Sequence, residues 1–420
     1  MLIEFSVGNF RSIKEVQTIS MVAGAIVSKS KQVDESNIIQ ATDKWRLLKS
    51  KAIYGANASG KSNIIRGMLA LIAIVNDSVK NERILREFIE EFKLSSDCDN
   101  KPSFFQIMLL IDGVFYRYGF EASDEEITSE WLFGTPGKKE VQFFLRERSE
   151  IYINDKQFSE GSKLRGLVRK DSLFLTVVKS LNGEVSKKIT DFINSIAVIS
   201  GLFVQEVYHN ALSYLKEETD RRRIVEMLKI ADTGIQDIRK IDIPDPHESD
   251  GGHSTDTKGK NDGSIVATAH QRIDEKTQER TLVGFDFMKN ESEGSKKMFE
   301  ISPVILYALE AGAPVFIDEF DARFHPLLTK KLVELFNSDV NKNSQFIFAT
   351  HDTNLLDSNL LRRDQICFVE KDKGGASHFY SLAEFKGVRN DASYEKDYIR
   401  GKYGAIPYLG DFNSLFESNA

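Results

Sequence analysis

The residues best suited to chemistry lie in two short segments that are far apart in the sequence. Residues 55–62 read Gly-Ala-Asn-Ala-Ser-Gly-Lys-Ser. They fit the phosphate-loop pattern, in which a second glycine is followed directly by Lys and by Ser or Thr. Residues 315–319 form an apolar run that ends in two adjacent carboxylates. Together the two segments predict binding of a nucleoside triphosphate with Mg²⁺, and its hydrolysis.

The first segment supplies the phosphate contacts. Small residues let the backbone wrap around a β-phosphate, with N–H groups pointing inward where the next helix begins. Lys61 is expected to bridge the β- and γ-phosphates, and the Ser62 hydroxyl to ligate Mg²⁺. The alternative is a glycine turn in front of a helix. The residues predicted here to bind ATP are Gly55, Ala56, Asn57, Ala58, Ser59, Gly60, Lys61, Ser62 and Asn63.

The second segment supplies the catalytic carboxylates. Asp318 and Glu319 follow a strand at the place where parallel sheets bind ligands. We expect Asp318 to hold Mg²⁺ and Glu319 to act as general base on the attacking water. His351 follows another apolar strand and is expected to reach the γ-phosphate, so Lys61, Glu319 and His351 form the predicted catalytic set. The alternatives are solvated carboxylates and a strand-capping histidine.

A third segment, residues 291–297, reads Glu-Ser-Glu-Gly-Ser-Lys-Lys and stands directly before a helical pattern. A serine and a glycine at a helix N-terminus can bind an anion. One subunit does not need a second anion site, so an ordinary helix cap is the alternative. This stretch is called the signature segment below.

The surrounding pattern predicts elements that would position these residues. Residues 52–54 form a short strand before the loop, and apolar residues at helical spacing follow it. The Asp112-Gly113 pair between apolar runs predicts a hairpin within an antiparallel sheet. The last third predicts alternating helices and strands, and hence a parallel sheet: helix 296–310, strand 315–317, helix 327–336, strand 346–349, helix 354–361 and strand 366–369.

Between these parts, residues 164–241 are predicted to be mostly helical, residues 265–269 and 282–287 to be strands, and residues 244–263 to be a mobile loop. The predicted domains are an N-terminal ATPase lobe, a helical lid and a C-terminal ATPase lobe. Their boundaries are 1–160, 161–280 and 281–420. The expected fold class is α/β: a mixed or parallel core sheet, an antiparallel β lobe and an inserted helical lid.

Composition narrows the functional class. The chain of 420 residues has a formal net charge of −7, which disfavours a surface coated with nucleic acid but leaves room for a local basic groove. Residues 221–223, three consecutive arginines, are one such cluster, and a solvated helix face is the alternative. The two cysteines, Cys98 and Cys367, show no metal-binding spacing. No apolar run is long enough to span a membrane, and no secretory signal is evident, so we expect a cytoplasmic protein.

The order of these segments resembles that of the ATP-binding-cassette ATPases. In that family a phosphate loop comes first, then a serine-containing signature, an acidic strand end, a crossing loop and a histidine. Ser292, Glu293, Gly294, Ser295 and Lys296 match the signature, with Glu293 in place of its first glycine. The crossing loop, or D-loop, corresponds to residues 321–326, including Asp321, Arg323 and His325. The resemblance implies that neighbouring subunits share each ATP head to tail, in a homodimer or a higher oligomer.

More narrowly, the chain is similar to SMC- and recombination-type ATPases from prokaryotic anti-phage defence. That branch includes the overcoming-lysogenization-defect nucleases, the ATPase subunits of Septu and PARIS, and the RloA- or AbiL-type ATPases. Beyond the segments above, residues 9–12 (Asn-Phe-Arg-Ser) and 400–407 carry the similarity. It implies that Arg11 joins the ATP-binding set. It also implies a separately encoded effector of Toprim, HNH or RNase type.

The chain also departs from these relatives. Residues 368–372 resemble the start of a Toprim nuclease domain, but the stretch after them is short and lacks an Asp-x-Asp run. We therefore expect no nuclease active site within this chain. Gln106 is a candidate for the family's glutamine loop, with a strand surface residue as the alternative.

The expected function is ATP hydrolysis coupled to opening and closing of an oligomer. The family resemblance implies that this cycle senses a phage-derived trigger and controls the effector. One alternative is a DNA-repair ATPase that clamps DNA, which would need a salt-sensitive basic groove. Another is a non-catalytic scaffold that ATP stabilises.

Overall fold

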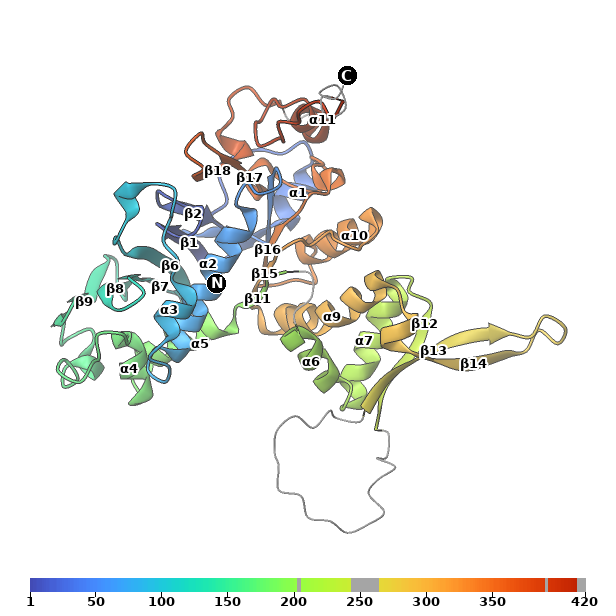
Figure 1. Cartoon of the computed structure of the whole chain (residues 1–420), viewed down its shortest axis with the longest axis horizontal. Coiled ribbons are helices and arrows are strands. Elements are labelled where there is room, and N and C mark those ends of the chain that lie inside the picture. Colours follow the sequence, from blue (N-terminus) through green and yellow to red (C-terminus); the bar gives the residue numbers. More distant parts are fainter. Residues whose placement is uncertain (202–204, 243–263, 390–391, 414–420) are drawn as a thin grey trace, which may run out of the picture. The chain divides into compact units, whose positions relative to one another are not determined.

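The computed structural model describes residues 1–201, 205–242, 264–389 and 392–413 (Figure 1). The expected mobile loop at 244–263 lies outside the described residues. The chain forms two compact units, which we describe separately. Unit 1 comprises Met1–Leu202, Ala308–Ala322 and Thr329–Ala420, and unit 2 comprises Phe203–Tyr307 and Arg323–Leu328. The predicted domain boundaries at 160 and 280 stay predictions.

A six-stranded mixed sheet forms the centre of unit 1, as the sequence predicted. All neighbouring pairs are parallel except the last, which is antiparallel. The central strands are buried on both faces, which explains their unbroken apolar runs. The strand order is β11 (Ala197–Ile199), β15 (Pro314–Ile317), β16 (Gln345–Ala349), β5 (Ser50–Gly55), β17 (Ile366–Lys371) and β18 (Ser377–Ser381).

A second, antiparallel sheet of seven strands confirms the predicted β lobe. Its central hairpin turns at Asp112 and Gly113, which have φ values of 51° and 77°, as a tight turn between twisted strands requires. The N-terminal strand also joins this sheet. The strand order is β10 (Glu150–Ile153), β9 (Val141–Glu147), β8 (Ile127–Thr135), β7 (Val114–Ala122), β6 (Ser103–Ile111), β1 (Leu2–Gly8) and β2 (Gln17–Ser20).

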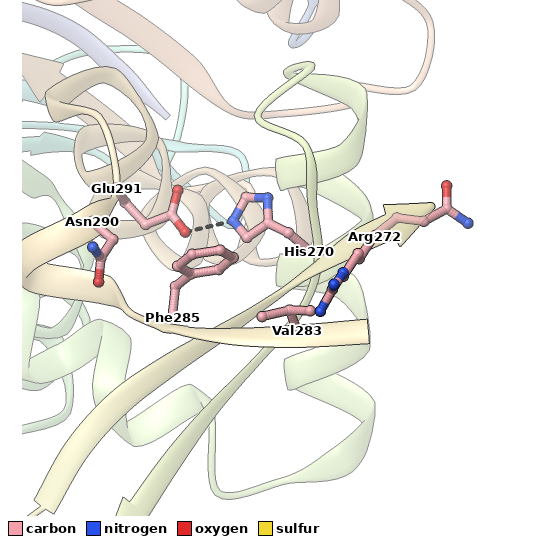
Figure 2. A pocket seen from close by; sticks show the side chains of 7 residues that line it. His270, Arg272, Val283, Phe285, Asn290 and Glu291 are labelled. Carbon is pink, nitrogen blue, oxygen red and sulfur yellow. Dashed lines mark hydrogen bonds and ion pairs between the residues drawn. The ribbon is translucent and has the colours of Figure 1, made fainter. Parts of the chain in front are cut away.

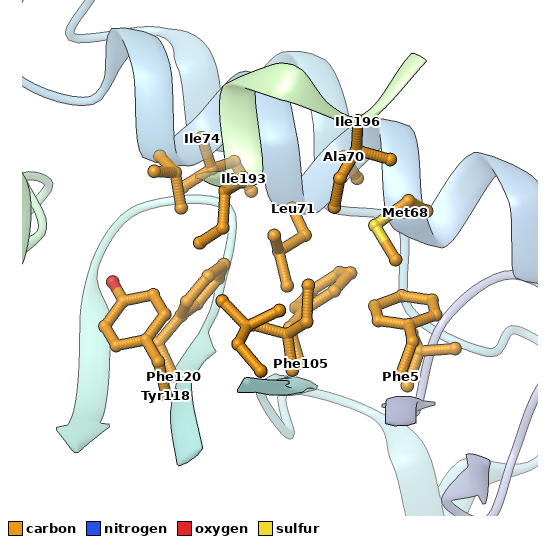
Figure 3. Packing of buried hydrophobic residues seen from close by; sticks show 14 of the residues in the cluster. Phe5, Met68, Ala70, Leu71, Ile74, Phe105, Tyr118, Phe120, Ile193 and Ile196 are labelled. Carbon is orange, nitrogen blue, oxygen red and sulfur yellow. The ribbon is translucent and has the colours of Figure 1, made fainter. Parts of the chain in front are cut away.

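The long helix α2 (Lys61–Asp77) packs against this antiparallel sheet. Figure 3 shows its side chains, including Met68 and Leu71, facing Phe5 and Phe105 of the strands. All four side chains are buried. Because α2 starts at the phosphate loop, this apolar packing fixes the loop's position relative to both sheets.

Two further helices, α4 (Phe174–Ser180) and α5 (Glu184–Ser195), complete this core. The fully buried carboxylate of Glu130 accepts hydrogen bonds from the main-chain N–H groups of Phe174 and Leu175, at 2.6 and 2.9 Å. It thereby satisfies the first N–H groups of α4. The remaining short elements of unit 1 are α1 (Lys31–Ser36), β3 (Ile38–Gln40), β4 (Arg46–Leu48), α3 (Ile84–Phe88) and α11 (Tyr394–Ile399).

Unit 2 contains helices and an antiparallel sheet. The sheet pairs in the order β12-β13-β14. The prediction that residues 164–241 are mostly helical is confirmed for α4 to α7 but is wrong at β11 and β12. Both of those strands pair with strands that come later in the chain, so tertiary pairing overrides local pattern. The elements of unit 2 are α6 (Gln205–Tyr214), α7 (Glu218–Ile230), β12 (Ile235–Asp242), β13 (Ser264–Ile273), β14 (Arg280–Asp286), α8 (Phe287–Asn290) and the start of α9 (Glu293–Ala311).

The arginine cluster at 221–223 lies on α7. Arg221 forms ion pairs with Glu218 and Asp237, and Arg222 also pairs with Glu218. These carboxylates offset the positive charge that a nucleic-acid groove would need. Arg222 is exposed, as the helix-face alternative expects, whereas Arg221 is buried.

The alternating pattern of the last third is confirmed, with one exception. Helix α10 (Pro326–Asn337) is present, but the helix predicted at 354–361 is wrong. Only a 3₁₀ turn, Thr353–Leu355, forms there. The side chains of Asp352 and Asp357 accept hydrogen bonds from main-chain N–H groups two residues further on, and such local bonds compete with helix formation. No helix in the described part of the chain combines the length and apolarity needed to cross a bilayer.

Candidate nucleotide-binding site

The phosphate loop has the predicted strand–loop–helix context. Strand β5 ends at Gly55, and α2 starts at Lys61. Between them, Ala58 and Gly60 have φ values of 60° and 110°, which curl the backbone into a compact loop. The positive end of the α2 dipole therefore lies at the loop and favours an anion there.

Both glycines of the motif are required by their surroundings. A Cβ atom on Gly55 would collide with the carbonyl oxygen of Val369 and come within 2.6 Å of the Ser59 hydroxyl. A Cβ atom on Gly60 would collide with the hydroxyl of Ser377. The loop is thus packed closely against the rest of unit 1.

Lys61 is buried in this loop. Its Nζ donates hydrogen bonds to the carbonyl oxygens of Gly55 and Ala56, at 2.8 and 3.0 Å. Burial lowers the pKa of Lys61 to about 8, although the nearby carboxylates of Asp318, Asp321 and Glu319 oppose the shift. At neutral pH the ammonium group is therefore largely charged, as phosphate binding requires.

This pKa predicts how ATP capture depends on pH. We expect kcat/KM for ATP to fall as pH rises through about 8, because the free protein loses the Lys61 proton. Bound phosphates stabilise the ammonium form, so kcat should stay flat over the same range. Steady-state phosphate release measured across this pH range tests whether kcat/KM falls while kcat stays constant. A kcat/KM that stays constant through this range would contradict the assignment.

The two carboxylates extend from the end of β15. Asp318 is 5% exposed, and its main-chain N–H donates to the Ile199 carbonyl at 2.8 Å. Glu319 has a φ of 48°, a strained value for a non-glycine residue. Its N–H donates to the Asp318 carboxylate at 3.1 Å.

The sheet order brings these segments together. Strand β16 lies between β15 and β5, and all three strands are parallel, so their carboxyl ends meet at one edge. A cavity of about 360 Å³ opens there. It is lined by Asn57, Ala58, Lys61, Ser62, Asp318, Glu319, Ala349, Thr350 and His351. A hydroxyl and a carboxylate, from Ser62 and Asp318, are suitable Mg²⁺ ligands.

His351 lines the same cavity, and its main-chain N–H donates to the Asp321 carboxylate at 3.1 Å. Burial, followed by the positive charge of Lys61, lowers the pKa of His351. The imidazole is therefore neutral at physiological pH and can donate one hydrogen bond.

Two buried polar atoms in the predicted ATP-binding set are unsatisfied, but neither residue lines the cavity. Ser59 Oγ and Arg11 Nε have no hydrogen-bond partner among the described residues. Such orphaned groups are rare in folded proteins unless a ligand or water satisfies them. Both residues belong to the predicted ATP-binding set.

Arg11 and Asn63 do not line the cavity. Arg11 forms an ion pair with Glu90 at 2.9 Å, and its main-chain N–H donates to the Glu90 carbonyl. The Asn63 side chain donates to the Ser12 hydroxyl at 2.6 Å. Their predicted contacts with ATP stay predictions.

Gln106, the candidate for a glutamine loop, lies within β6. Its side-chain oxygen accepts a hydrogen bond from the Trp131 indole at 3.2 Å. This contact within the sheet favours the strand-surface alternative.

The signature segment lies in unit 2. The Ser292 hydroxyl accepts a hydrogen bond from the Ser295 N–H at 3.1 Å and so caps the start of α9. A Cβ atom on Gly294 would come within 2.7 Å of the Arg323 carbonyl oxygen, so glycine is needed at this position. The D-loop arginine therefore lies directly against the signature segment.

Glu293, which replaces the family's first signature glycine, is neutralised by two cations. Its carboxylate lies 2.9 Å from Lys296 and 2.9 Å from Arg323. Pairing with Lys296 lowers the pKa of Glu293. The extra negative charge at an anion-binding helix start is thus offset within the same unit. In the adjoining loop, the His325 ring accepts a hydrogen bond from the Leu327 N–H.

A buried carboxylate anchors the signature segment to the unit 2 sheet. Glu291 accepts hydrogen bonds from His270 at 2.6 Å and from Thr268 at 2.5 Å, and both partners lie on β13. In Figure 2 a dashed line joins His270 to Glu291, and the Phe285 ring lies next to both, beside a cavity of about 520 Å³. Because Glu291 directly precedes Ser292, this contact fixes where the segment begins. Sequence reasoning missed it, since neither His270 nor Thr268 belongs to a motif.

Comparisons with known proteins agree with a nucleotide-binding fold. The family model described as "AAA domain, putative AbiEii toxin, Type IV TA system" matches residues 52–357. Among curated proteins, none is significantly similar in sequence. Several solved structures are similar to the chain.

One is an SMC head bound to the C-terminal winged-helix domain of ScpA, with 15% identity, a TM-score of 0.42, and coverage of 90% of this chain and 97% of that one. Another is the SMC head domain from Thermotoga maritima, with 12% identity, a TM-score of 0.41, and coverage of 90% and 98%. A third is an SMC head with an extended coiled coil, bound to the C-terminal domain of ScpA derived from Pyrococcus furiosus. It has 15% identity, a TM-score of 0.39, and coverage of 96% and 98%. The family match spans most of the chain and includes the phosphate loop, both carboxylates and His351, and the chain therefore belongs to this AAA-domain family of P-loop ATPases.

Proposed function

We propose that this protein binds and hydrolyses ATP with Mg²⁺ in the cavity at the ends of β5, β15 and β16. The single observation that carries the proposal is that Lys61, Ser62, Asp318, Glu319 and His351 contribute to the lining of one cavity although they come from three separate segments. Lys61 would neutralise the phosphates, while Ser62 and Asp318 would hold Mg²⁺. When bound, Mg²⁺ stabilises charge on the β- and γ-phosphates.

Within this site, Glu319 would accept a proton from the attacking water, and neutral His351 would donate a hydrogen bond to the γ-phosphate. These groups follow β5, β15 and β16, whose parallel pairing brings them to one edge of the sheet. The resulting reaction is ATP plus water to ADP plus phosphate.

We further propose that subunits assemble head to tail, as a dimer or a higher oligomer, with the signature segment of one completing the ATP site of another. Support comes from Gly294, which packs against the D-loop residue Arg323. A helix of 19 residues presents a strong N-terminal dipole to an anion. The D-loop residues Asp321, Arg323 and His325 would lie at the same interface.

The cycle would report a phage-derived trigger to a separately encoded effector, of Toprim, HNH or RNase type. This rests on the sequence resemblance to defence ATPases. ATP can drive such a switch only if it binds the closed state several kcal/mol more tightly than the open state. A cytoplasmic location would suit this role.

Nucleotide binding by wild type and by Lys61→Ala tests the core of the proposal. Fluorescent ATP should bind wild type in the presence of Mg²⁺, and Lys61→Ala should weaken binding roughly a hundredfold. Lys139→Ala is the matched control, since Lys139 is exposed and distant from the loop in sequence. Equal affinity in all three proteins would refute the proposal. Co-purification with the neighbouring gene product, followed by phage challenge, tests the effector.

A further inference from the structure

Three side chains form a hydrogen-bonded chain behind the phosphate loop. The Asn63 amide nitrogen lies 2.6 Å from the Ser12 hydroxyl, which lies 2.7 Å from the Ser377 hydroxyl. Ser377 in turn lies 2.6 Å from the carbonyl oxygen of Ser59, inside the loop. These residues come from α2, from the turn after β1 and from β18. The hydrogen bonds therefore join three segments that are distant in sequence at the phosphate loop.

The direction of these hydrogen bonds follows from the groups involved. The Ser59 carbonyl oxygen can only accept, so Ser377 donates its single hydroxyl hydrogen to it. Ser12 must then donate to Ser377, and it accepts from the Asn63 amide. The hydrogen bonds are therefore all donated in one direction, from Asn63 toward Ser59. No hydroxyl in the series can exchange its donor and acceptor roles without breaking a bond.

This series of hydrogen bonds sets the orientation of the peptide group between Ser59 and Gly60. In a trans peptide unit the C=O and N–H groups point in opposite directions. Because Ser377 holds the Ser59 carbonyl on its own side, the Gly60 N–H points to the other side. Successive N–H groups of this loop are the ones that cradle phosphate.

Ser377 is itself held in place by the sheet. Its main-chain N–H donates to the Ser12 carbonyl at 2.7 Å, and its side chain is 1% exposed. It pairs with Lys371 in the β17–β18 hairpin, and Val369 of the same hairpin closes against Gly55. The hairpin thus contacts the loop at both of its motif glycines. Gly60 must lack a Cβ atom because the Ser377 hydroxyl occupies that space.

We propose that Ser377, supported by Ser12, is a positioning residue that turns the Gly60 N–H toward the phosphates of a bound nucleotide. The inference rests on the proposed nucleotide binding and adds a residue that no motif contains. Neither hydroxyl needs to touch the nucleotide, since the effect passes through the Ser59–Gly60 peptide.

Nucleotide affinity and turnover of Ser377→Ala test this role. We expect the Kd for ATP and for ADP to rise about tenfold, the effect of one lost hydrogen bond, while kcat at saturating ATP changes less than about twofold. Ser12→Ala should have a similar effect, and the double variant should be no worse than the stronger single one. Ser381→Ala is the control, being the same substitution on the same strand.

The Gly60 amide resonance, observed in protein labelled with ¹⁵N-glycine, gives a readout that general destabilisation would not move. ADP should shift this resonance in wild type and in the control Ser381→Ala. The shift should be smaller in Ser377→Ala. If Ser377→Ala does not fold, Ser12→Ala replaces it in the comparison. An unchanged Kd in both serine variants, alongside lost binding in Lys61→Ala, would overturn this inference alone. Failure of wild type to bind any nucleotide would instead overturn the proposed function.

Discussion

Glu319→Gln is expected to reduce ATP turnover by about two to four orders of magnitude while leaving ATP binding intact. Glutamine keeps the shape and hydrogen-bonding reach of the side chain but cannot accept a proton at neutral pH. Glu319 lines the cavity together with Lys61 and His351. Phosphate release and fluorescent ATP binding measure the two quantities separately.

The same variant should also accumulate the closed oligomer, because ATP that cannot be hydrolysed keeps the subunits together. Light scattering with and without ATP would show the shift in mass. Glu275→Gln, in an exposed turn, is the control for the loss of one negative charge. Turnover at the wild-type rate in Glu319→Gln would remove Glu319 from the catalytic set, and an unshifted mass would argue against closure by ATP.

The proposed division of labour, with Asp318 as metal ligand and Glu319 as general base, is consistent with the surroundings of the two carboxylates. Asp318 is buried and accepts a hydrogen bond from the Glu319 N–H, so its orientation is fixed, as a metal ligand requires. Glu319 follows it in a conformation that few residues adopt, which redirects the chain at the strand end. Adjacent residues can therefore hold a metal and activate water without competing for one position.

The parts of the site that could be predicted from sequence are local. The phosphate loop and the acidic strand end are contiguous motifs, and each brings its own strand or helix with it. Their meeting also follows from pattern, because the alternating C-terminal third predicts a parallel sheet and parallel strands present their carboxyl ends at one edge. The cavity confirms that Lys61, Asp318 and His351 meet there.

The parts that could not be predicted depend on distant pairing. Ser377 and Ser12 are single serines 365 positions apart, and only the placement of β18 beside the loop brings them together. The anchor of Glu291 on His270 likewise depends on where β13 packs. The helix predicted at 354–361 is absent for a local reason. The side chains of Asp352 and Asp357 accept hydrogen bonds from nearby main-chain N–H groups, and these bonds compete with helix formation.

A mixture of two inactive variants should recover activity if each ATP site is built from two subunits. Lys61→Ala damages the phosphate loop, and Ser292→Arg blocks the signature segment, so each variant alone should be nearly inactive. In a mixed dimer, one site pairs the intact Lys61 of one subunit with the intact Ser292 of the other. Random mixing should then restore roughly a quarter of the wild-type turnover, because half of the dimers are mixed and each has one working site.

Mixing Lys61→Ala with Glu319→Gln provides the control. Both lesions lie in the same cavity of unit 1, so every site in such a mixture carries one of them and no recovery is expected. Turnover measured against mixing ratio should peak at equal amounts for the first pair and stay flat for the second. If neither mixture recovers although capture through a tag on one variant retains the untagged other, each subunit must complete its own site, and the signature segment must serve only as the cap of α9. Recovery confined to the first mixture would instead show that residues 292–294 act on a nucleotide held by the neighbouring copy.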